Sequence, residues 1–225
     1  MSTGNRLNGY IRIALLGAAF LPLSGCNGIF DFYDDPARTG GYGFVSACTP
    51  DTPGTIYINT SSYTAWKYID LGMMAVDSTD IAPDGTEAPE PPADFDFAVH
   101  RYDVKTNGGS VLETEYSSFG DLLASGALPE GDYVRDEWTT DRIAIDMSGM
   151  MDGVIVYAES DYNPEFSKWL NVDTSVMPPI YTMSGRIYIL KLADGTCAAV
   201  KLANYINETG VKGYMTIEYI YPLEF

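Results

Sequence analysis

Methionine is the residue type in this sequence whose placement suggests chemistry. Five of the nine methionines fall between Asp146 and Ser184, and these are Met147, Met150, Met151, Met177 and Met183. Gly149, Gly153 and the pair Pro178-Pro179 flank several of them, which predicts loops. A methionine inside a core usually fills gaps, whereas a thioether at a loop tip can be a soft ligand for a metal ion or a haem iron. The residues alone leave both interpretations open.

The sequence offers no recognisable catalytic arrangement. His100 is the only histidine, and Cys48 and Cys197 are the only cysteines besides Cys26, which is too few for a zinc site with the usual ligands. There is no Ser-His-Asp set and no P-loop or Rossmann fingerprint. Carboxylates are plentiful, but no pattern selects a pair of the kind that glycosidases use. We therefore expect a protein that is not an enzyme.

The N-terminus has the features of a lipoprotein signal peptide. Arg6 and Arg12 precede a short apolar run from Ile13 to Leu21, which is too short to span a bilayer. The run leads to Leu23-Ser24-Gly25-Cys26, a lipobox whose cysteine thiol would accept a diacylglyceryl group. Several acyl chains on Cys26 would anchor the mature protein stably in a Gram-negative envelope membrane. The alternative is an ordinary signal peptide with an incidental cysteine.

The mature chain is strongly acidic. Removal of Arg6 and Arg12 leaves 11 basic residues against 31 acidic ones, a net charge of −20. Such a surface repels nucleic acids and anionic lipid headgroups, so no nucleic-acid partner is expected. It also disfavours polyanionic ligands unless a local basic pocket exists, and the sequence shows no cluster of Lys and Arg.

Composition divides the chain into three parts. Residues 1–25 are the predicted signal peptide, and residues 26–54 are rich in Gly, Asp and Pro, which predicts a lipidated tether and an irregular arm. Residues 55–225 are enough for one domain with a sizeable core. An extracytoplasmic compartment would permit a disulfide between Cys48 and Cys197, but two unpaired buried cysteines are equally compatible with the sequence.

Period-two alternation predicts strands throughout residues 55–225. The earlier predicted strands are Thr55–Ile58, Ser62–Leu71, Phe95–Asn107 (as one long strand), Arg142–Met147 and a buried run Val154–Tyr157. Five acidic residues and four prolines predict an exposed loop from Asp77 to Ala93. Short helical patterns occur at Ser118–Ser125 and Glu165–Leu170.

The last forty residues give the clearest pattern. Two strands, Gly185–Leu192 and Cys197–Tyr205, flank a hairpin turn at Ala193–Thr196. A second turn at Asn207–Gly210 leads into a final strand, in which alternation assigns to the core face Met215, Ile217, Tyr219 and Tyr221. We therefore predict an all-β fold, a single antiparallel β-domain with short helical insertions.

Three stretches together resemble the HmuY family of bacterial haem-binding lipoproteins. They are Phe95–Asn107 with its His-Arg-Tyr-Asp-Val-Lys-Thr-Asn motif, Leu192–Tyr205 and Gly213–Pro222, and the Trp66–Tyr68 segment agrees with them. The resemblance extends from about Thr55 to Pro222. It implies a lipid-anchored protein exposed at the outer membrane. Such a protein takes haem (iron protoporphyrin IX) from host haemoproteins and delivers it to a TonB-dependent outer-membrane transporter.

The resemblance also implies where the iron ligands lie. Members of the family hold haem iron with two axial side chains from loops, either two histidines or two methionines. The corresponding loops here are Met147–Gly153 and Asp173–Met183, which contain no histidine. We therefore expect Met177, beside Pro178-Pro179, to pair with Met150, with Met151 as the alternative to Met150.

The sequence also predicts positions for other residues of this region. Met147 should point into the core from a strand end. His100 lies in a strand motif and should be partly buried and locally hydrogen-bonded. Tyr157, Trp169 and Tyr181 are expected to form aromatic walls around haem, although they could equally be ordinary core aromatics. The alternative function on the same fold is binding of another tetrapyrrole or small ligand without iron ligation.

Overall fold

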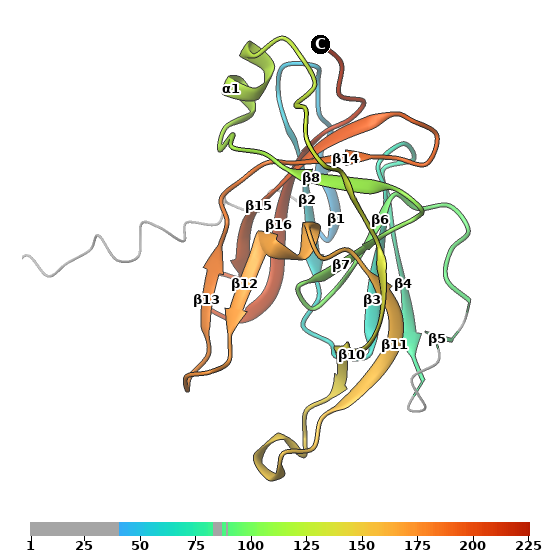
Figure 1. Ribbon diagram of the computed structural model, residues 1–225, viewed down its shortest axis with the longest axis vertical. Helices are drawn as coiled ribbons and strands as arrows, with labels where there is room; N and C mark the ends of the chain where they lie inside the picture. Colours follow the sequence, from blue (N-terminus) through green and yellow to red (C-terminus); the bar gives the residue numbers. More distant parts are fainter. Residues whose placement is uncertain (1–40, 83–86, 89) are drawn as a thin grey trace, which may run out of the picture. The chain divides into compact units, whose positions relative to one another are not determined.

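The computed structural model of the protein describes residues 41–82, 87–88 and 90–225. The predicted signal peptide, Cys26 and most of the predicted tether lie outside these residues. Nearly all of the described elements are antiparallel strands (Figure 1), which confirms the predicted fold class. Within the described residues, the helical elements are α1 (Phe119–Ala124) and two short 3-10 turns, η3 (Met150–Asp152) and η4 (Phe166–Trp169).

A seven-stranded sheet with the order β1-β2-β16-β15-β14-β8-β9 forms one half of the fold. Its strands are β1 (Gly43–Ser46), β2 (Gly54–Asn59), β8 (Ser110–Glu113), β9 (Val134–Arg135), β14 (Tyr188–Lys191), β15 (Cys197–Ile206) and β16 (Lys212–Ile220). The predicted hairpins are confirmed, since β14 pairs with β15 and β15 with β16. Strand β1 lies within the segment for which we expected an irregular arm, and it pairs with β2.

A five-stranded sheet with the order β5-β4-β3-β6-β7 forms the other half. Its strands are β3 (Ala65–Asp70), β4 (Ala75–Ile81), β5 (Glu87–Ala88), β6 (Phe97–His100) and β7 (Asp103–Thr106). Two separate hairpins complete the fold. They consist of β10 (Glu137–Asp146) with β11 (Val156–Tyr162), and of β12 (Leu170–Asp173) with β13 (Ile180–Met183).

Alternation along the strands distributes side chains between three apolar clusters. In β6, Phe97 and Val99 belong to the main core, together with Ile217 of the seven-stranded sheet, whereas Ala98 faces the opposite way. That opposite face of the five-stranded sheet is covered by Ile143 of β10 and its neighbours. A third cluster lies on the other face of the seven-stranded sheet, where α1 and residues near the C-terminus cover β14 and β15. Each cluster follows from the two-residue period of a strand.

Along β16, the predicted core face is only part of the buried surface. Met215, Ile217 and Tyr219 are buried in the main core, as predicted. Ile220 on the opposite face is also buried, because it belongs to the cluster that contains α1. A strand that is covered on both faces loses the simple division between a core side and a solvent side.

The prediction of one long strand from Phe95 to Asn107 is wrong. The chain turns between β6 and β7, and Arg101 takes the left-handed conformation with φ of 54°. The Thr60 hydroxyl donates to the Arg101 carbonyl at 2.7 Å, and Arg101 Nη1 donates to the Ser61 carbonyl at 2.5 Å. These long-range contacts stabilise a turn that lacks the usual Gly, Asn or Pro signals.

Two further strand predictions need correction. Strand β4 continues into the region expected to be an exposed loop, and Thr79 and Ile81 are buried. The run Val154–Tyr157 was expected to be a buried strand, but β11 begins only at Val156. Val154, Val156 and Tyr157 are exposed, and Ile155 is half-buried. This run therefore needs an explanation other than core packing.

Both described cysteines are free thiols. Cys48 Sγ donates to the Tyr221 carbonyl at 3.2 Å, and Cys197 starts β15. Of the two alternatives that the sequence left open, the structure contains the unpaired cysteines. None of the described helices is long and apolar enough to cross a membrane.

Candidate functional site

The two separate hairpins bound a cleft with a volume of about 1020 Å³. Both hairpins extend away from the sheets toward the lower part of the view in Figure 1. The cleft lies between the β10–β11 hairpin, the β12–β13 hairpin and the turn that joins β6 to β7. This volume is at the upper end of the range of about 300–1,000 Å³ that is typical of small-molecule sites.

Four of the five methionines in the stretch meet in this cleft, which we call the methionine cleft. Met147, Met150 and Met151 come from the loop between β10 and β11, and Met177 comes from the loop between β12 and β13. Relative exposures are 39% for Met150, 87% for Met151 and 70% for Met177. Side chains this exposed do not fill gaps in a core, so the packing interpretation fails for these three residues.

The outcome for the remaining two methionines differs. Met147 was expected to point into the core, but it is only half-buried and lines the methionine cleft. The prediction for Met147 is therefore wrong, because β10 ends at Asp146 and the chain turns into the η3 loop directly after it. Met183 packs against the main core from β13, where it is paired with Leu170.

Local hydrogen bonds hold the η3 loop in one shape. Met150 N donates to the Met147 carbonyl at 3.0 Å, and Gly153, with φ of 78°, donates its N–H to the Met150 carbonyl at 3.1 Å. A Cβ at Gly149 would lie 2.9 Å from the Val154 carbonyl oxygen, so only glycine fits there. The loop thus presents Met150 and Met151 from a compact turn.

The opposing loop is also closed by its own polar groups. Asp173 Oδ1 accepts hydrogen bonds from Ser175 N at 2.9 Å and from Ser175 Oγ at 2.6 Å. These bonds turn the chain after β12. Met177 follows in the same loop, two residues beyond Ser175, and is directed to the surface of the cleft.

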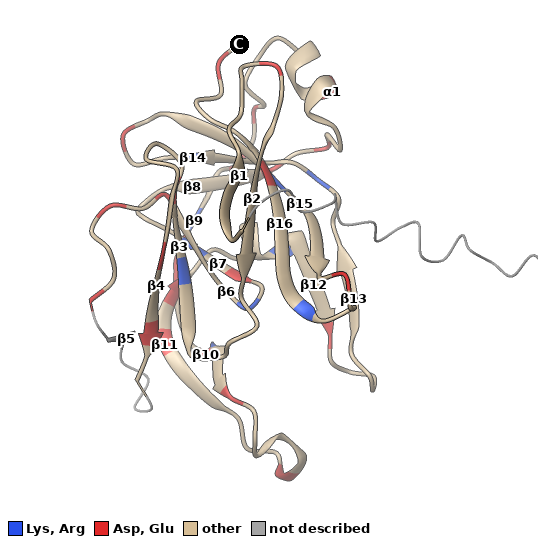
Figure 2. Ribbon diagram, turned by 180° about the vertical axis from the view of Figure 1, so that it is seen from behind, with Lys and Arg blue, Asp and Glu red and all other residues tan. Residues whose placement is uncertain are grey.

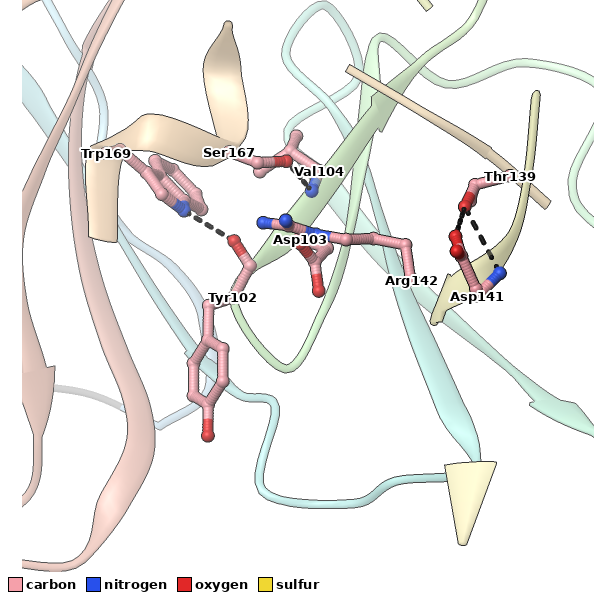
Figure 3. Close-up of polar contacts among 8 residues, drawn as sticks. All are labelled: Tyr102, Asp103, Val104, Thr139, Asp141, Arg142, Ser167 and Trp169. Atoms are coloured by element: carbon pink, nitrogen blue, oxygen red, sulfur yellow. Dashed lines mark hydrogen bonds and ion pairs between the residues drawn. The ribbon is translucent and has the colours of Figure 1, made fainter. Parts of the chain in front are cut away.

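The floor of the methionine cleft is fixed by hydrogen bonds between η4 and the β6–β7 turn. Trp169 Nε1 donates to the Tyr102 carbonyl at 2.8 Å, and Val104 N donates to Ser167 Oγ at 3.0 Å (Figure 3). The hydroxyls of Tyr102 and Tyr181 lie 3.1 Å apart, which links the turn to the β12–β13 hairpin. Burial and this hydrogen bond raise the pKa of Tyr102 to about 12, so its hydroxyl is protonated at neutral pH.

The three aromatic residues expected as walls have different positions. Tyr157 lines the methionine cleft and is partly exposed. Trp169 is fully buried in the main core and is not among the lining residues, so it supports the floor from beneath. Tyr181 lies behind Tyr102 and stacks on Tyr205 at 5.6 Å between ring centroids. The aromatic surface of the cleft instead includes Tyr102 and Tyr162, which sequence reasoning missed.

Charged residues that sequence reasoning missed also line the methionine cleft. Arg142 Nε lies 2.8 Å from Asp103 Oδ1, and Lys168 Nζ lies 2.5 Å from Glu165 Oε2. Burial raises the pKa of Asp103, and the Arg142 charge opposes this rise. Alternation could have indicated Arg142, because Ile143 faces the sheet and its neighbour must therefore face outward. No pattern in the sequence indicates that the charge of Lys168 lies on the same cleft.

His100 does not contribute to this chemistry, although it pairs across the β6–β7 turn with Asp103, whose side chain lines the methionine cleft. His100 is fully rather than partly buried, and it does not line the methionine cleft. Its Nε2 lies 2.8 Å from the Tyr63 carbonyl, and its ring lies 5.3 Å from that of Trp66. Burial lowers the pKa of His100 to about 4, so it is neutral at physiological pH. Within the described part of the chain, no group of three or more His, Cys, Asp or Glu residues could hold a metal ion.

The donor set of the methionine cleft fits a tetrapyrrole that contains a soft metal. Thioethers lie on both walls, and aromatic and aliphatic surfaces such as Tyr157, Leu170 and Val172 lie between them. Two cations, Arg142 and Lys168, are available to acidic groups at the ligand's edge. Neutral sulfur is a suitable ligand for haem iron, and the absence of histidine from the lining residues leaves sulfur as the soft donor.

Comparison with known proteins gives independent results. The family model described as HmuY protein matches residues 62–219. A solved structure of a candidate HmuY-like heme-binding protein from Bacteroides vulgatus has 55% sequence identity and a TM-score of 0.76, covering 82% of this chain and 100% of the other. A candidate lipoprotein from Bacteroides fragilis has 49% identity and a TM-score of 0.77, covering 82% of this chain and 97% of the other.

More distant structures share the fold. Apo PinO, attributed to Porphyromonas gingivitis, has 27% identity and a TM-score of 0.64, with 75% of this chain and 96% of the other covered. The apo HmuY analogue of Tannerella forsythia, at 23% identity and a TM-score of 0.63, covers 75% of this chain and 94% of its own. No curated protein matches the chain significantly.

Proposed function

Because this chain belongs to the HmuY family, we propose that it binds haem in the methionine cleft and acts as a carrier rather than an enzyme. The observation that supports this proposal best is the meeting of methionines from two hairpins in one cleft whose described lining contains no histidine. Bound haem would supply an iron atom with two axial positions and two propionate carboxylates. Met177 from one hairpin and Met150 from the other would hold the iron.

The choice of Met150 over Met151 rests on exposure. Both side chains line the cleft, but Met151 is 87% exposed and Met150 is 39% exposed. The less exposed side chain would lose less hydration and less side-chain freedom on binding. Met151 is the alternative ligand from the same loop. Tyr157 and Tyr102 would contact the faces or edges of the macrocycle.

The test is a haem titration of the soluble domain, with and without dithionite, followed by absorption spectroscopy. Thioether sulfur favours the reduced metal, so ferrous haem should bind more tightly than ferric haem. Met177→Ala should weaken ferrous binding by at least about tenfold, because loss of even a supporting group around a metal typically costs that much. Met150→Ala should have the next largest effect.

A matched control is Met73→Ala. Met73 is a methionine with 78% exposure that does not line the methionine cleft. This variant should bind haem as the wild type does. Equal affinities for ferric and ferrous haem, or cleft variants that behave like Met73→Ala, would remove the thioether ligands. Binding of iron-free porphyrin would then favour the alternative of a tetrapyrrole-binding module without iron ligation.

We also place this carrier at the outer membrane, anchored through Cys26 and exposed at the cell surface. The lipobox supports the anchor, as does the 49% identical candidate lipoprotein. In this role the protein would take haem from host haemoproteins and pass it to a TonB-dependent transporter. Persistence of a Cys26→Ser variant in carbonate-washed membranes would contradict the lipid anchor.

A further inference from the structure

We propose that Arg142 is the carboxylate-binding residue of the methionine cleft, and that it selects porphyrins with free propionate side chains over their neutral esters. This inference deepens the proposed function, because it assumes that the methionine cleft takes a tetrapyrrole. It does not assume that a methionine ligates the iron. The two claims can therefore fail separately.

Arg142 has free hydrogen-bonding capacity toward the cleft. Its Nε donates to Asp103 Oδ1 at 2.8 Å, but Nη1 and Nη2 donate to none of the residues that the structure describes. The Arg142 side chain is 52% exposed and lines the methionine cleft. A guanidinium group presents its terminal N–H groups as a planar fork that matches a carboxylate, so the free edge of Arg142 suits a propionate.

The guanidinium is held in place before any ligand binds. Asp103 opens β7 and its side chain is only 14% exposed, so it holds Arg142 from the floor of the cleft (Figure 3). The ring of Tyr162, on the paired strand β11, lies 5.5 Å from Arg142 Cζ. A donor whose side chain is already ordered loses less conformational entropy when it binds a carboxylate.

Electrostatics make a direct donor necessary. Acidic residues outnumber basic ones, and the few basic positions are scattered over the fold (Figure 2). Among the residues that line the methionine cleft, Asp103 and Asp141 balance the charges of Arg142 and Lys168. The cleft therefore has no large positive potential to attract a dicarboxylate, and discrimination must come from individual hydrogen bonds.

Arg142 is a better candidate than Lys168 for this contact. Lys168 Nζ is engaged by Glu165 at 2.5 Å, and an ammonium group acts as a point charge without a bidentate edge. Its side chain is 57% exposed, so water competes for its remaining donors. Lys168 can add a second, weaker contact, but the geometric match to a carboxylate belongs to Arg142.

The experiment measures affinities for iron-free protoporphyrin IX and its dimethyl ester, by quenching of protein fluorescence. Removing iron removes coordination by the methionines, and their remaining apolar contacts are shared by acid and ester, so the ratio of the two affinities reports on the carboxylates. The wild type should prefer the free acid by about tenfold or more, as expected for a charge-assisted hydrogen bond. Arg142→Gln should reduce this preference to about twofold or less, and Arg142→Lys should give an intermediate value.

Two further variants separate the loss of the Arg142 guanidinium from the effects of an unpaired Asp103 carboxylate and of a changed net charge. Arg142→Gln leaves the Asp103 carboxylate buried without its cation, so a double variant with Asp103→Asn removes that cost while still lacking the guanidinium. It should show the same loss of preference. Arg135→Gln removes an exposed arginine of β9 that does not line the cleft, and it should keep the wild-type preference.

Each outcome bears on one claim or the other. A wild type that binds acid and ester equally, or an Arg142→Gln variant that keeps the full preference, would overturn the role of Arg142. If Met177→Ala binds ferrous haem normally while Arg142→Gln loses the acid preference, the iron ligation fails and the role of Arg142 stands. Failure of the wild type to bind haem or porphyrin at all would overturn both.

Discussion

Four hairpin turns of the described chain form two pairs that differ in kind. The turns that follow β14 and β15 are closed by Asp194 and Asn207, whose side-chain oxygens accept hydrogen bonds from Thr196 N at 2.8 Å and Thr209 N at 3.1 Å. The loops that follow β10 and β12 contain an aspartate that accepts a similar bond, Asp146 from Ser148 N at 2.8 Å and Asp173 from Ser175 N at 2.9 Å, but they also carry exposed methionines. The polar groups stabilise these turns, whereas the exposed apolar side chains in the second kind make no visible contribution to the fold.

The β12–β13 loop shows that closing a turn and presenting a methionine are separate roles of different residues. Asp173 accepts hydrogen bonds from Ser175 in the same way that Asp194 does from Thr196. The turn after β12 is therefore closed without help from Met177, which lies further along the loop. The comparison indicates that polar residues determine the shape of these four turns. Met177 is therefore not required for the turn and can contribute to binding.

The largest expected effect on stability comes from truncating a methionine in the core rather than one in the cleft. Met215 in β16 is fully buried in the main cluster and is paired with Ile58. Met215→Ala should lower the free energy of unfolding by about 2–5 kcal/mol, because it removes buried atoms and leaves a cavity. Chemical denaturation measures this loss.

The matched partner of Met215→Ala is Met177→Ala, which removes the same atoms from an exposed loop. It should change the free energy of unfolding by less than about 0.5 kcal/mol, as surface substitutions usually do. Haem affinity should show the opposite order, with Met177→Ala weakened and Met215→Ala unchanged at temperatures where it is folded. A large loss of stability in Met177→Ala would remove the contrast between the two kinds of methionine.

The second effect concerns pH. Acid should lower the stability of the core but leave haem binding in the cleft unchanged. Neutral His100 is buried in β6, and its pKa is lowered to about 4 by burial, whereas that of an unfolded histidine is about 6.5. Between these values the unfolded chain takes up a proton that the folded chain does not. The free energy of unfolding should therefore fall as pH drops from 6.5 to 4, with His100 contributing up to about 3 kcal/mol.

The measurement is denaturation at several pH values for the wild type and His100→Gln, whose amide can still donate to the Tyr63 carbonyl. The variant should lose less stability over that pH range. Haem binding should persist at pH 5.5 in both proteins, because the proposed sulfur ligands have no proton to gain. Parallel pH profiles for the two proteins would exclude His100 as the acid-sensitive group. Loss of the haem spectrum in folded His100→Gln would make His100 a ligand.

The smallest effect tests the polar turns. Asn207 Oδ1 accepts hydrogen bonds from Val211 N at 2.8 Å and from Thr209 Oγ1 at 2.9 Å. Asn207→Ala should cost about 1 kcal/mol of stability, because it removes the group that closes this turn. Thermal unfolding measures the loss, and haem affinity should stay at the wild-type value. A change in haem affinity would show that the two kinds of hairpin are coupled.

Much of the fold could be predicted from the sequence because its signals are local. Alternation in Cys197–Tyr205 and the Ala193–Thr196 turn predicted a hairpin that the structure contains. The turn at Arg101 could not be predicted, because its left-handed backbone is stabilised by Thr60 and Ser61, some forty residues earlier in the chain. Likewise, the apolar run from Val154 was read as buried, because alternation does not show which face another element covers.

The sequence by itself determined that several methionines lie outside strands and long helices, since Gly149, Gly153 and the Pro178-Pro179 pair interrupt such elements near them. Only the tertiary structure decided that Met177 shares a cleft with Met150, that Trp169 lies beneath its floor, and that Arg142 meets Asp103 there. Glycine and proline act through the conformation of their own backbone. A cleft is made by contacts between residues far apart in the chain, and these depend on how complete hairpins are placed by the packed sheets.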